Sequence, residues 1–150
     1  MFPLRQSELA EDKRGTEGLS ARYPAKGGQK GMEQNKRQTG NKGEDIACDF
    51  LSNLGYQIIK RNYQYGHGEI DIIAKDGEIL VFVEVKYRKS LEYGPPELAI
   101  TQSKQKQIRK VAEAYIYEND VRDTSCRIDV IAILHFPKQE PKINHIINAF

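Results

Sequence analysis

Two alternating apolar stretches joined by an Asp-Gly turn are the feature that most limits how this chain can fold. Residues 69–74 and 79–88 show the two-residue period of β-strands, and Asp76-Gly77 between them is typical of a hairpin. One face of the expected hairpin is entirely apolar and consists of Ile70, Ile72, Ala74, Val81, Val83 and Val85. Because a large apolar face needs a cover, the sheet must pack against other elements.

The opposite face of the hairpin carries its charges at one end. With the tight turn at Asp76-Gly77, the expected register pairs Asp71 with Phe82. Asp71 and Glu84 are then diagonal neighbours, with Cα atoms roughly 7–8 Å apart. Apolar residues occupy the half of this face near the turn, so this side of the sheet is expected to be covered as well. The other half holds Glu69, Asp71, Glu84 and Lys86.

Carboxylates gathered in this way repel one another, and burying them unpaired is costly. A divalent cation relieves that repulsion, and hard oxygen ligands suit Mg²⁺ or Mn²⁺. We therefore predict a metal site held by Asp71 and Glu84, with Lys86 acting on water or on phosphorane charge. The alternative is an open hairpin whose charges face water and form weak surface ion pairs.

Helical periodicity on both sides of the hairpin predicts the elements that cover it. One apolar stripe predicts a helix over 42–54, with Asn41 as its N-cap and Gly55 as its stop, and another predicts a helix over about 101–117. Further strands are expected at 56–63, near 126–134 and at 143–150. The order αβββαββ indicates an α/β fold with a central mixed sheet flanked by helices.

Residues 1–40 differ in composition from the rest of the chain. They hold six glycines, eight Lys or Arg and five Asp or Glu, and their apolar residues show no period. We expect a disordered N-terminal extension over 1–40 and one folded domain over 41–150. The whole chain has a net charge of +2, and the extension accounts for 8 − 5 = +3, which leaves −1 for the domain. That balance argues against a strongly basic nucleic-acid coat protein.

The composition also bears on location. The longest unbroken apolar runs are five residues, and a membrane-spanning helix needs about 20. No apolar segment typical of a secretion signal follows the first residues. The two cysteines, Cys48 and Cys126, are too far apart for a Cys-x-x-Cys metal pair and too few for a disulfide framework. We interpret both cysteines as small buried residues of a reducing compartment, in a bacterial or organellar interior, and expect a cytoplasmic protein with no membrane partner.

The charged residues of the hairpin also occur in a known pattern. Gly68-Glu69-Ile70-Asp71 followed by Glu84-Val85-Lys86 resembles the PD-(D/E)XK nuclease motif. Over about residues 40–134 the chain is similar to the YraN-like family of bacterial proteins, which is related to Holliday-junction resolvases and restriction endonucleases. Further matching segments are Gly43-Glu44-x-x-Ala47, Gly55-Tyr56, Arg61-Asn62-Tyr63, Lys104 and Arg127-Ile-Asp-Val.

This resemblance implies a restriction-endonuclease-like αβββαβ core and a Mg²⁺- or Mn²⁺-dependent endonuclease site. Asp71 and Glu84 would hold the metal, Lys86 would assist the attacking water, and Glu69 and Glu44 would support them. Glu44 has an alternative role in a capping box with Asn41. The competing functions are a non-catalytic nucleic-acid-binding module that keeps this scaffold and, on weaker grounds, a protein-interaction adaptor.

The densest positive charge follows the hairpin in sequence. Arg88 lies at the end of its second strand, and the second helix contributes Lys104, Lys106 and Arg109. These residues are predicted to track the phosphate backbone of a nucleic acid, with DNA as the first expectation. The alternative for the helix is an ordinary solvated face, and for Lys104 a snorkelling lysine. A dimer is compatible with this reading.

Overall fold

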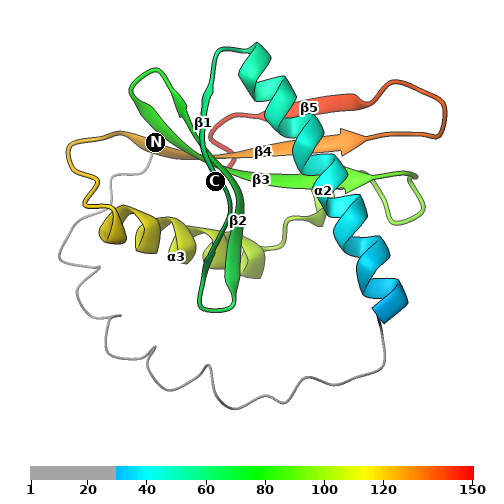
Figure 1. The fold of residues 1–150 in the computed structure, drawn as a ribbon, viewed down its shortest axis with the longest axis horizontal. Coiled ribbons are helices and arrows are strands. Elements are labelled where there is room, and N and C mark those ends of the chain that lie inside the picture. Colours follow the sequence, from blue (N-terminus) through cyan, green and yellow to red (C-terminus); the bar gives the residue numbers. More distant parts are fainter. Residues whose placement is uncertain (1–29) are drawn as a thin grey trace.

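Helices and strands follow one another in the predicted order αβββαββ, with one additional short 3₁₀ turn (Figure 1). A computed structural model describes residues 30–150. The elements are α2 (Lys30–Asn53), β1 (Gln57–Tyr65), β2 (Gly68–Asp76), β3 (Ile79–Arg88), η2 (Pro96–Ala99), α3 (Gln102–Glu118), β4 (Cys126–Leu134) and β5 (Lys142–Ile146). The prediction of a mixed α/β fold is confirmed.

The five strands form one mixed sheet in the order β1-β2-β3-β4-β5. Neighbouring strands are antiparallel except β3 and β4, which run parallel from Leu80 opposite Cys126 to Arg88 opposite Leu134. A parallel pair needs a crossover connection, and η2 with α3 supplies it. As a result, α3 begins close to the end of β3, where the predicted site residues lie.

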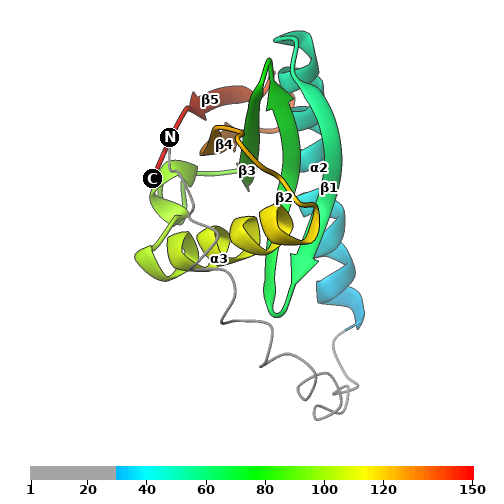
Figure 2. The same cartoon turned by 90° about the vertical axis from the view of Figure 1, so that its left-hand side faces the viewer.

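Helices cover both faces of the sheet, as the two apolar faces of the hairpin predicted. In Figure 2, α2 and α3 lie on opposite sides of the strands. Ile73, Leu80 and Phe82 pack under α3, and the α3 residues in that core are Ile108, Val111, Ala112, Tyr115 and Ile116. On the other face, Ala47 and Leu51 of α2 cover a core that includes Ile72, Ala74, Val81 and Val83. The alternative of an open, water-facing hairpin is therefore wrong.

The register of the hairpin differs from the prediction by two residues. Asp76 pairs with Ile79 and Ile73 with Phe82, so the turn residues are Gly77 and Glu78. Gly77 has a φ of +58°, which a glycine at the first central position of a II′ turn adopts without strain. A shift of two residues does not by itself move any side chain to the other face of the sheet. It moves the position opposite Asp71 from Phe82 to Glu84.

The first described helix begins earlier than predicted. α2 starts at Lys30, so Asn41 lies inside the helix and cannot be its N-cap. Helical continuation through Gly40 and Asn41 was not expected because neither residue favours a helix interior. The expected boundary at residue 40 falls within α2. Residues 1–29 lie outside the described residues. None of the helices in 30–150 is long and apolar enough to cross a membrane.

One further departure concerns Ile70. Side chains two residues apart in a strand normally share a face, and Ile70 was therefore predicted to lie with Ile72. In the structure Ile72 packs in the core under α2 and Ile70 in the core under α3. The faces of β2 are thus exchanged around Asp71, at the centre of the predicted site.

Candidate functional site

The two central strands separate where the site begins. Pairing between β2 and β3 extends from the turn to Ile72 opposite Val83 and no further. In the same register the next two residues are Asp71 and Glu84, which face each other across the opening fork. The Val85 amide donates a 2.7 Å hydrogen bond to Asp71 Oδ2. The Asp71 carboxylate therefore takes the place of a backbone partner and is fixed in the fork.

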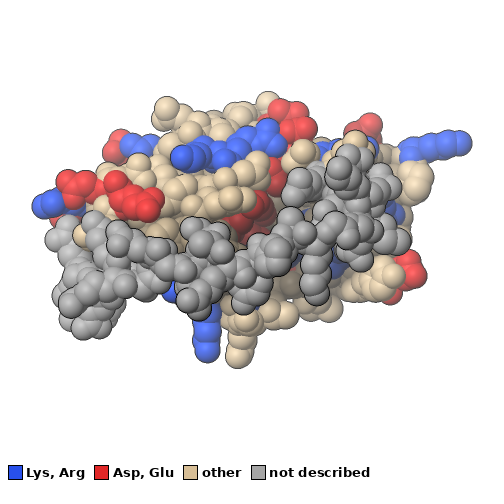
Figure 3. All heavy atoms as spheres, turned by 60° about the horizontal axis from the view of Figure 1, so that its bottom comes forward, with Lys and Arg blue, Asp and Glu red and all other residues tan. Residues whose placement is uncertain are grey.

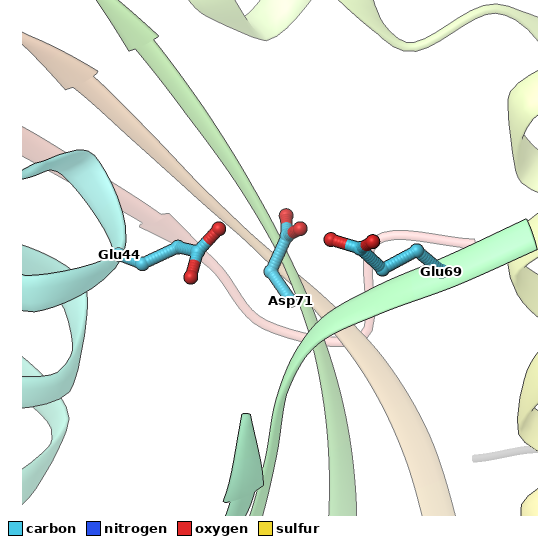
Figure 4. A group of neighbouring side chains, drawn as sticks. All are labelled: Glu44, Glu69 and Asp71. Carbon is cyan, nitrogen blue, oxygen red and sulfur yellow. The ribbon is translucent and has the colours of Figure 1, made fainter. Parts of the chain in front are cut away.

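Three carboxylates converge on this fork from two elements. Glu44 of α2, Glu69 of β2 and Asp71 of β2 each offer an oxygen, and these oxygens all lie within 4.8 Å of one another. Figure 4 shows Asp71 between the other two, with the three side chains pointing toward one another. Glu44 is only 8% exposed. We refer to Glu44, Glu69, Asp71 and Glu84 as the carboxylate cluster.

Glu84 is the most deeply buried member of the cluster, with 3% of its surface exposed. Its Oε1 lies 3.1 Å from Lys86 Nζ and 3.4 Å from Lys104 Nζ. Its Oε2 is buried and has no hydrogen-bond partner within residues 30–150. Buried carboxylate oxygens are rarely left in this state because the loss of hydration is not replaced. Glu84 Oε2 is therefore a buried acceptor that could bind a cation or a hydrogen-bond donor of a ligand.

A pocket of about 460 Å³ opens beside the fork. Its acidic side is formed by Glu44, Asp71 and Glu84, and its other walls come from the end of β3 and from α2, namely Val85, Lys86, Tyr87, Arg88, Thr39 and Gly40. On the face drawn in Figure 3, acidic atoms lie in a central hollow and basic atoms are scattered around it. A small anionic group that needs both a cation and basic side chains fits such a pocket.

Burial and mutual repulsion change the acidity of the cluster. The pKa of Asp71 is raised to about 8, first by burial and then by the negative charge of Glu84, against the opposing effect of the Val85 amide. Burial also raises the pKa of Glu44, although Asn62 and Arg61 oppose it. Both shifts favour a bound proton in the cluster. A divalent ion would take the place of such a proton.

Strand β1 holds Glu44 in position. Arg61 Nη2 lies 2.8 Å from Asp45 Oδ1 and 3.5 Å from Glu44 Oε2, and the Asn62 amide also donates to Glu44. The alternative role of Glu44 in a capping box with Asn41 is wrong, because Asn41 lies within α2. Glu44 is directed into the cluster by its contacts with β1.

The four residues predicted to contact nucleic acid do not form one surface. Lys104 meets Glu84, and Arg88 lines the pocket with its buried Nε unpartnered within residues 30–150. Lys106 is exposed, and it lies about 200° around the helix from Lys104, because two residues separate them. The guanidinium of Arg109 lies 5.7 Å from the centre of the Phe150 ring. Arg88 and Lys104 are thus at the site, whereas Lys106 and Arg109 point elsewhere.

Sequence reasoning missed the roles of Arg61 and Asn62. Arg61, Asn62 and Tyr63 were part of the family resemblance, but nothing in their pattern indicated a contact with α2. The one available signal was Asn62 itself, since asparagine is enriched at positive φ, and in the structure its φ is +52°. The contribution of Thr39 and Gly40 to the pocket was hidden by the wrong helix start.

Comparison with known proteins agrees with the resemblance seen in the sequence. The model of the Uncharacterised protein family UPF0102 matches residues 43–133. A UPF0102 protein of Geobacter sulfurreducens is 49% identical over 111 residues, which cover 74% of this chain and 87% of the relative. One from Caldicellulosiruptor saccharolyticus is 45% identical over 117 residues, covering 77% and 99%. The matched region contains every member of the carboxylate cluster, and the chain belongs to the UPF0102 family.

Proposed function

We propose that the protein is a cytoplasmic, divalent-metal-dependent endonuclease that hydrolyses phosphodiester bonds of nucleic acid, with DNA as the first candidate. The observation that carries this proposal is Glu84 Oε2, which is buried in the pocket with no partner within residues 30–150, beside an Asp71 whose pKa is about 8. Lys86 and Lys104 offset part of the negative charge at Glu84 Oε1, and the burial of the remaining carboxylate oxygens supports a site for a cation.

The residues present fit Mg²⁺ or Mn²⁺. Asp71 and Glu84 would hold the ion, and Glu44 and Glu69 offer further oxygens at the side of Asp71. All four are hard oxygen donors, and the pocket leaves room for water and substrate. When bound, such an ion activates water and offsets charge on a phosphoryl oxygen.

Lys86 supplies the fixed positive charge of the reaction. Its Nζ lies 3.1 Å from Glu84 Oε1, and its side chain is 24% exposed at the wall of the pocket. The ion pair directs the ammonium group toward the place where a phosphate beside the carboxylates would lie. There it stabilises the negative charge that develops on the phosphoryl oxygens during attack.

The end of β3 favours a phosphodiester as the substrate. Arg88 lines the same pocket, and its buried Nε has no partner within residues 30–150. A guanidinium donor without a protein acceptor suits a phosphate oxygen. Lys86 and Arg88 thus offer two cationic groups along one strand, opposite the carboxylates.

A non-catalytic nucleic-acid-binding module is the second candidate. It is favoured by the two lysines, Lys86 and Lys104, that both contact Glu84 Oε1. These ammonium groups supply part of the positive charge that a metal would otherwise provide. In this alternative the site binds phosphate and cleaves nothing.

Mn²⁺ titration by calorimetry tests the metal site. We expect wild type to bind and the variants Asp71→Asn and Glu84→Gln to lose at least tenfold in affinity. Asp120→Asn, which changes an exposed carboxylate in a surface ion pair, is the matched control and should bind like wild type. Equal affinity in all four proteins would overturn the assignment of Asp71 and Glu84.

Single-turnover cleavage at saturating enzyme tests the chemistry. On a panel of duplex, single-stranded and branched substrates with Mg²⁺, Lys86→Ala should reduce the rate about 100-fold or more. Binding measured in Ca²⁺ should change little. Absence of cleavage by wild type, together with metal-independent binding, would support the second candidate instead.

A further inference from the structure

The carboxylate cluster depends on an exchange of faces in the β1–β2 hairpin. Arg61 reaches α2 through Glu44 and Asp45, whereas Tyr63, two residues further on, packs in the core under α3. In β2 the same exchange separates Ile72 from Ile70. In both strands, therefore, the side chains change from one face of the sheet to the other at the same pair of positions.

The exchange coincides with one unusual residue. Arg61 lies opposite Ile72 and Tyr63 opposite Ile70, so the register is unchanged across position 62. The register shift between these two strands lies earlier, between Ile58 and Lys60. Asn62 consequently stands opposite Asp71. Its φ of +52° is the only positive φ within β1 and β2. A left-handed residue interrupts the alternation of side chains, which accounts for the exchange.

The exchange has direct consequences for the carboxylates. Asp71 lies where the side chains of β2 change faces. Its carboxylate points into the fork, where it accepts a hydrogen bond from the backbone amide of Val85. Glu69, one residue before Ile70, is carried to the side of α2 and comes within reach of Glu44. With ordinary alternation through position 62, Glu69 would lie on the α3 side, apart from Glu44. The cluster is thus assembled by the conformation of β1.

We propose that Asn62 is a positioning residue whose left-handed backbone brings Glu69 and Asp71 to Glu44 and so assembles the metal site. This inference rests on the proposed function. It assigns the main effect to the backbone of Asn62, and the hydrogen bond from its side chain to Glu44 is the smaller contribution. Strained conformations of this kind persist where the surrounding structure requires them, often at functional sites.

The proposal separates two substitutions that remove the same side chain. Glycine adopts a positive φ without steric cost, so Asn62→Gly should keep the exchange of faces. Valine is branched at Cβ and strongly opposes a positive φ, so Asn62→Val should abolish it. Asn62→Ala opposes it more mildly and replaces Asn62→Val in every comparison if the valine variant does not fold.

The matched control is Lys138, an exposed residue in the turn between β4 and β5 with a φ of +58°. Lys138→Val introduces the same backbone conflict away from the cluster. Its Mn²⁺ affinity should equal that of wild type, although its midpoint of thermal unfolding should fall. This control distinguishes loss of the site from a general loss of stability.

Two measurements decide the outcome. In calorimetry we expect Asn62→Val to lose at least tenfold in Mn²⁺ affinity, and Asn62→Gly and Lys138→Val to stay within about threefold of wild type. By NMR, the close approach of Gly68 to the Val111 methyl groups should be seen in wild type and Asn62→Gly and be lost in Asn62→Val. Unchanged affinity in Asn62→Val, or equal losses in the glycine and valine variants, would overturn the proposal.

The NMR measurement keeps the inference apart from the proposed function. If wild type binds no Mn²⁺, the metal site fails, and the Gly68–Val111 contact alone decides the role of Asn62. Loss of that contact in Asn62→Val with retention in Asn62→Gly would still support the backbone role. Retention in both variants would overturn it.

Discussion

The sheet carries two buried groups of charges that solve the same electrostatic problem in opposite ways. Near the start of β4, Asp129 is fully buried. Its carboxylate oxygens lie 2.9 Å from Arg127 Nε, 2.8 Å from His145 Nε2 and 2.9 Å from the backbone nitrogen of Asn148. Arg127 in turn contacts Asp76 and the hydroxyl of Tyr56. We refer to these residues as the Arg127 network. In the carboxylate cluster, by contrast, Glu84 Oε2 has no partner in the described part of the chain.

The acidities of the two groups show the same difference. Burial alone would raise the pKa of Asp129, but hydrogen bonds from His145, Arg127 and Asn148 outweigh it and the pKa is lowered. Burial, and then the negative charge of Glu84, raise the pKa of Asp71 to about 8. A buried carboxylate whose counter-charges come from the chain, such as Asp129, serves the stability of the fold. A buried carboxylate that lacks enough counter-charge, such as Asp71, indicates that a bound cation supplies it.

The largest effect we expect is in the Arg127 network. Asp129→Ala leaves the buried guanidinium of Arg127 with only the partly exposed Asp76 as a counter-charge, and should lower the free energy of unfolding by about 3–5 kcal/mol. Urea denaturation with and without Mn²⁺ measures this change. The loss should be the same in both conditions, because no member of the network faces the fork.

A surface ion pair provides the control for that substitution. Arg122 and Asp120 lie 2.7 Å apart, but both are well exposed. Arg122→Ala should therefore change the free energy of unfolding by less than about 1 kcal/mol. Equal effects of Asp129→Ala and Arg122→Ala would mean that the Arg127 network contributes no more than a surface pair.

The second effect has the opposite sign. Asp71→Asn removes a charge that burial and Glu84 both oppose, and should raise the free energy of unfolding of the metal-free protein by about 1–2 kcal/mol at pH 8. The same variant should lose Mn²⁺ binding. Thermal unfolding in a chelator measures the gain. A lower midpoint than wild type would show that the charge of Asp71 is compensated and that the contrast with Asp129 is wrong.

The pH dependence of stability sharpens the contrast further. For an acid whose pKa is raised on folding, the native state binds more protons than the unfolded state between the two pKa values. Wild type without metal should therefore lose stability as the pH rises from about 4 to 8, and Asp71→Asn should lose less, because only the raised pKa of Glu44 remains. The difference in unfolding midpoint between the two proteins should widen over this range. A constant difference would contradict the raised pKa.

Asp129 should act in the opposite direction. Its pKa is lowered on folding, so its contribution to stability is present above its ordinary pKa of about 4 and is lost as the pH falls below that value. Acid unfolding followed by circular dichroism measures the loss. Wild type should lose stability more steeply than Asp129→Ala below pH 4.

Much of the architecture could be predicted because it depends on periodicity. The alternation in 69–88 gave both covered faces of the hairpin, and the spacing of Ile108 and Val111 gave the inner face of α3. The position of the hairpin turn was predicted incorrectly because local turn preferences compete there with contacts in the packed sheet. Nothing in the sequence pattern distinguishes a turn at Asp76-Gly77 from one at Gly77-Glu78, and only the packed sheet selects between them.

The assembly of the site could be predicted less well, for a physical reason. The side-chain faces of β2 follow from alternation only as long as alternation holds, and the left-handed Asn62 that breaks it is on a different strand. Glu69 was predicted to lie near Asp71, as it does, but alternation could not show that it also approaches Glu44 from the side of α2. The start of α2 was missed because Gly40 and Asn41 are poor helix formers that the longer helix accommodates.

The smallest expected effect concerns Lys104. Its positive charge would oppose the binding of a metal ion but favour the binding of a nucleic acid. Its Nζ lies 3.4 Å from Glu84 Oε1, and its side chain is 29% exposed. Lys104→Met removes a positive charge close to the proposed ion, which corresponds to ~1 kcal/mol of repulsion and about fivefold in affinity. Mn²⁺ should therefore bind more tightly to the variant than to wild type. Oligonucleotide binding should weaken, and its salt slope should flatten by about one ion.

These two changes of opposite sign are what separate Lys104 from its neighbour. Lys106→Met removes the same charge from the exposed side of α3 and should leave Mn²⁺ affinity unchanged. If Lys104→Met behaves like Lys106→Met in both titrations, Lys104 is a snorkelling lysine and its contact with Glu84 carries no function. If Lys104→Met instead weakens Mn²⁺ binding, Lys104 holds Glu84 in place for the ion. Glu84 would then depend on a neighbour of the chain, as Asp129 depends on Arg127, and the contrast between the two groups would be one of degree.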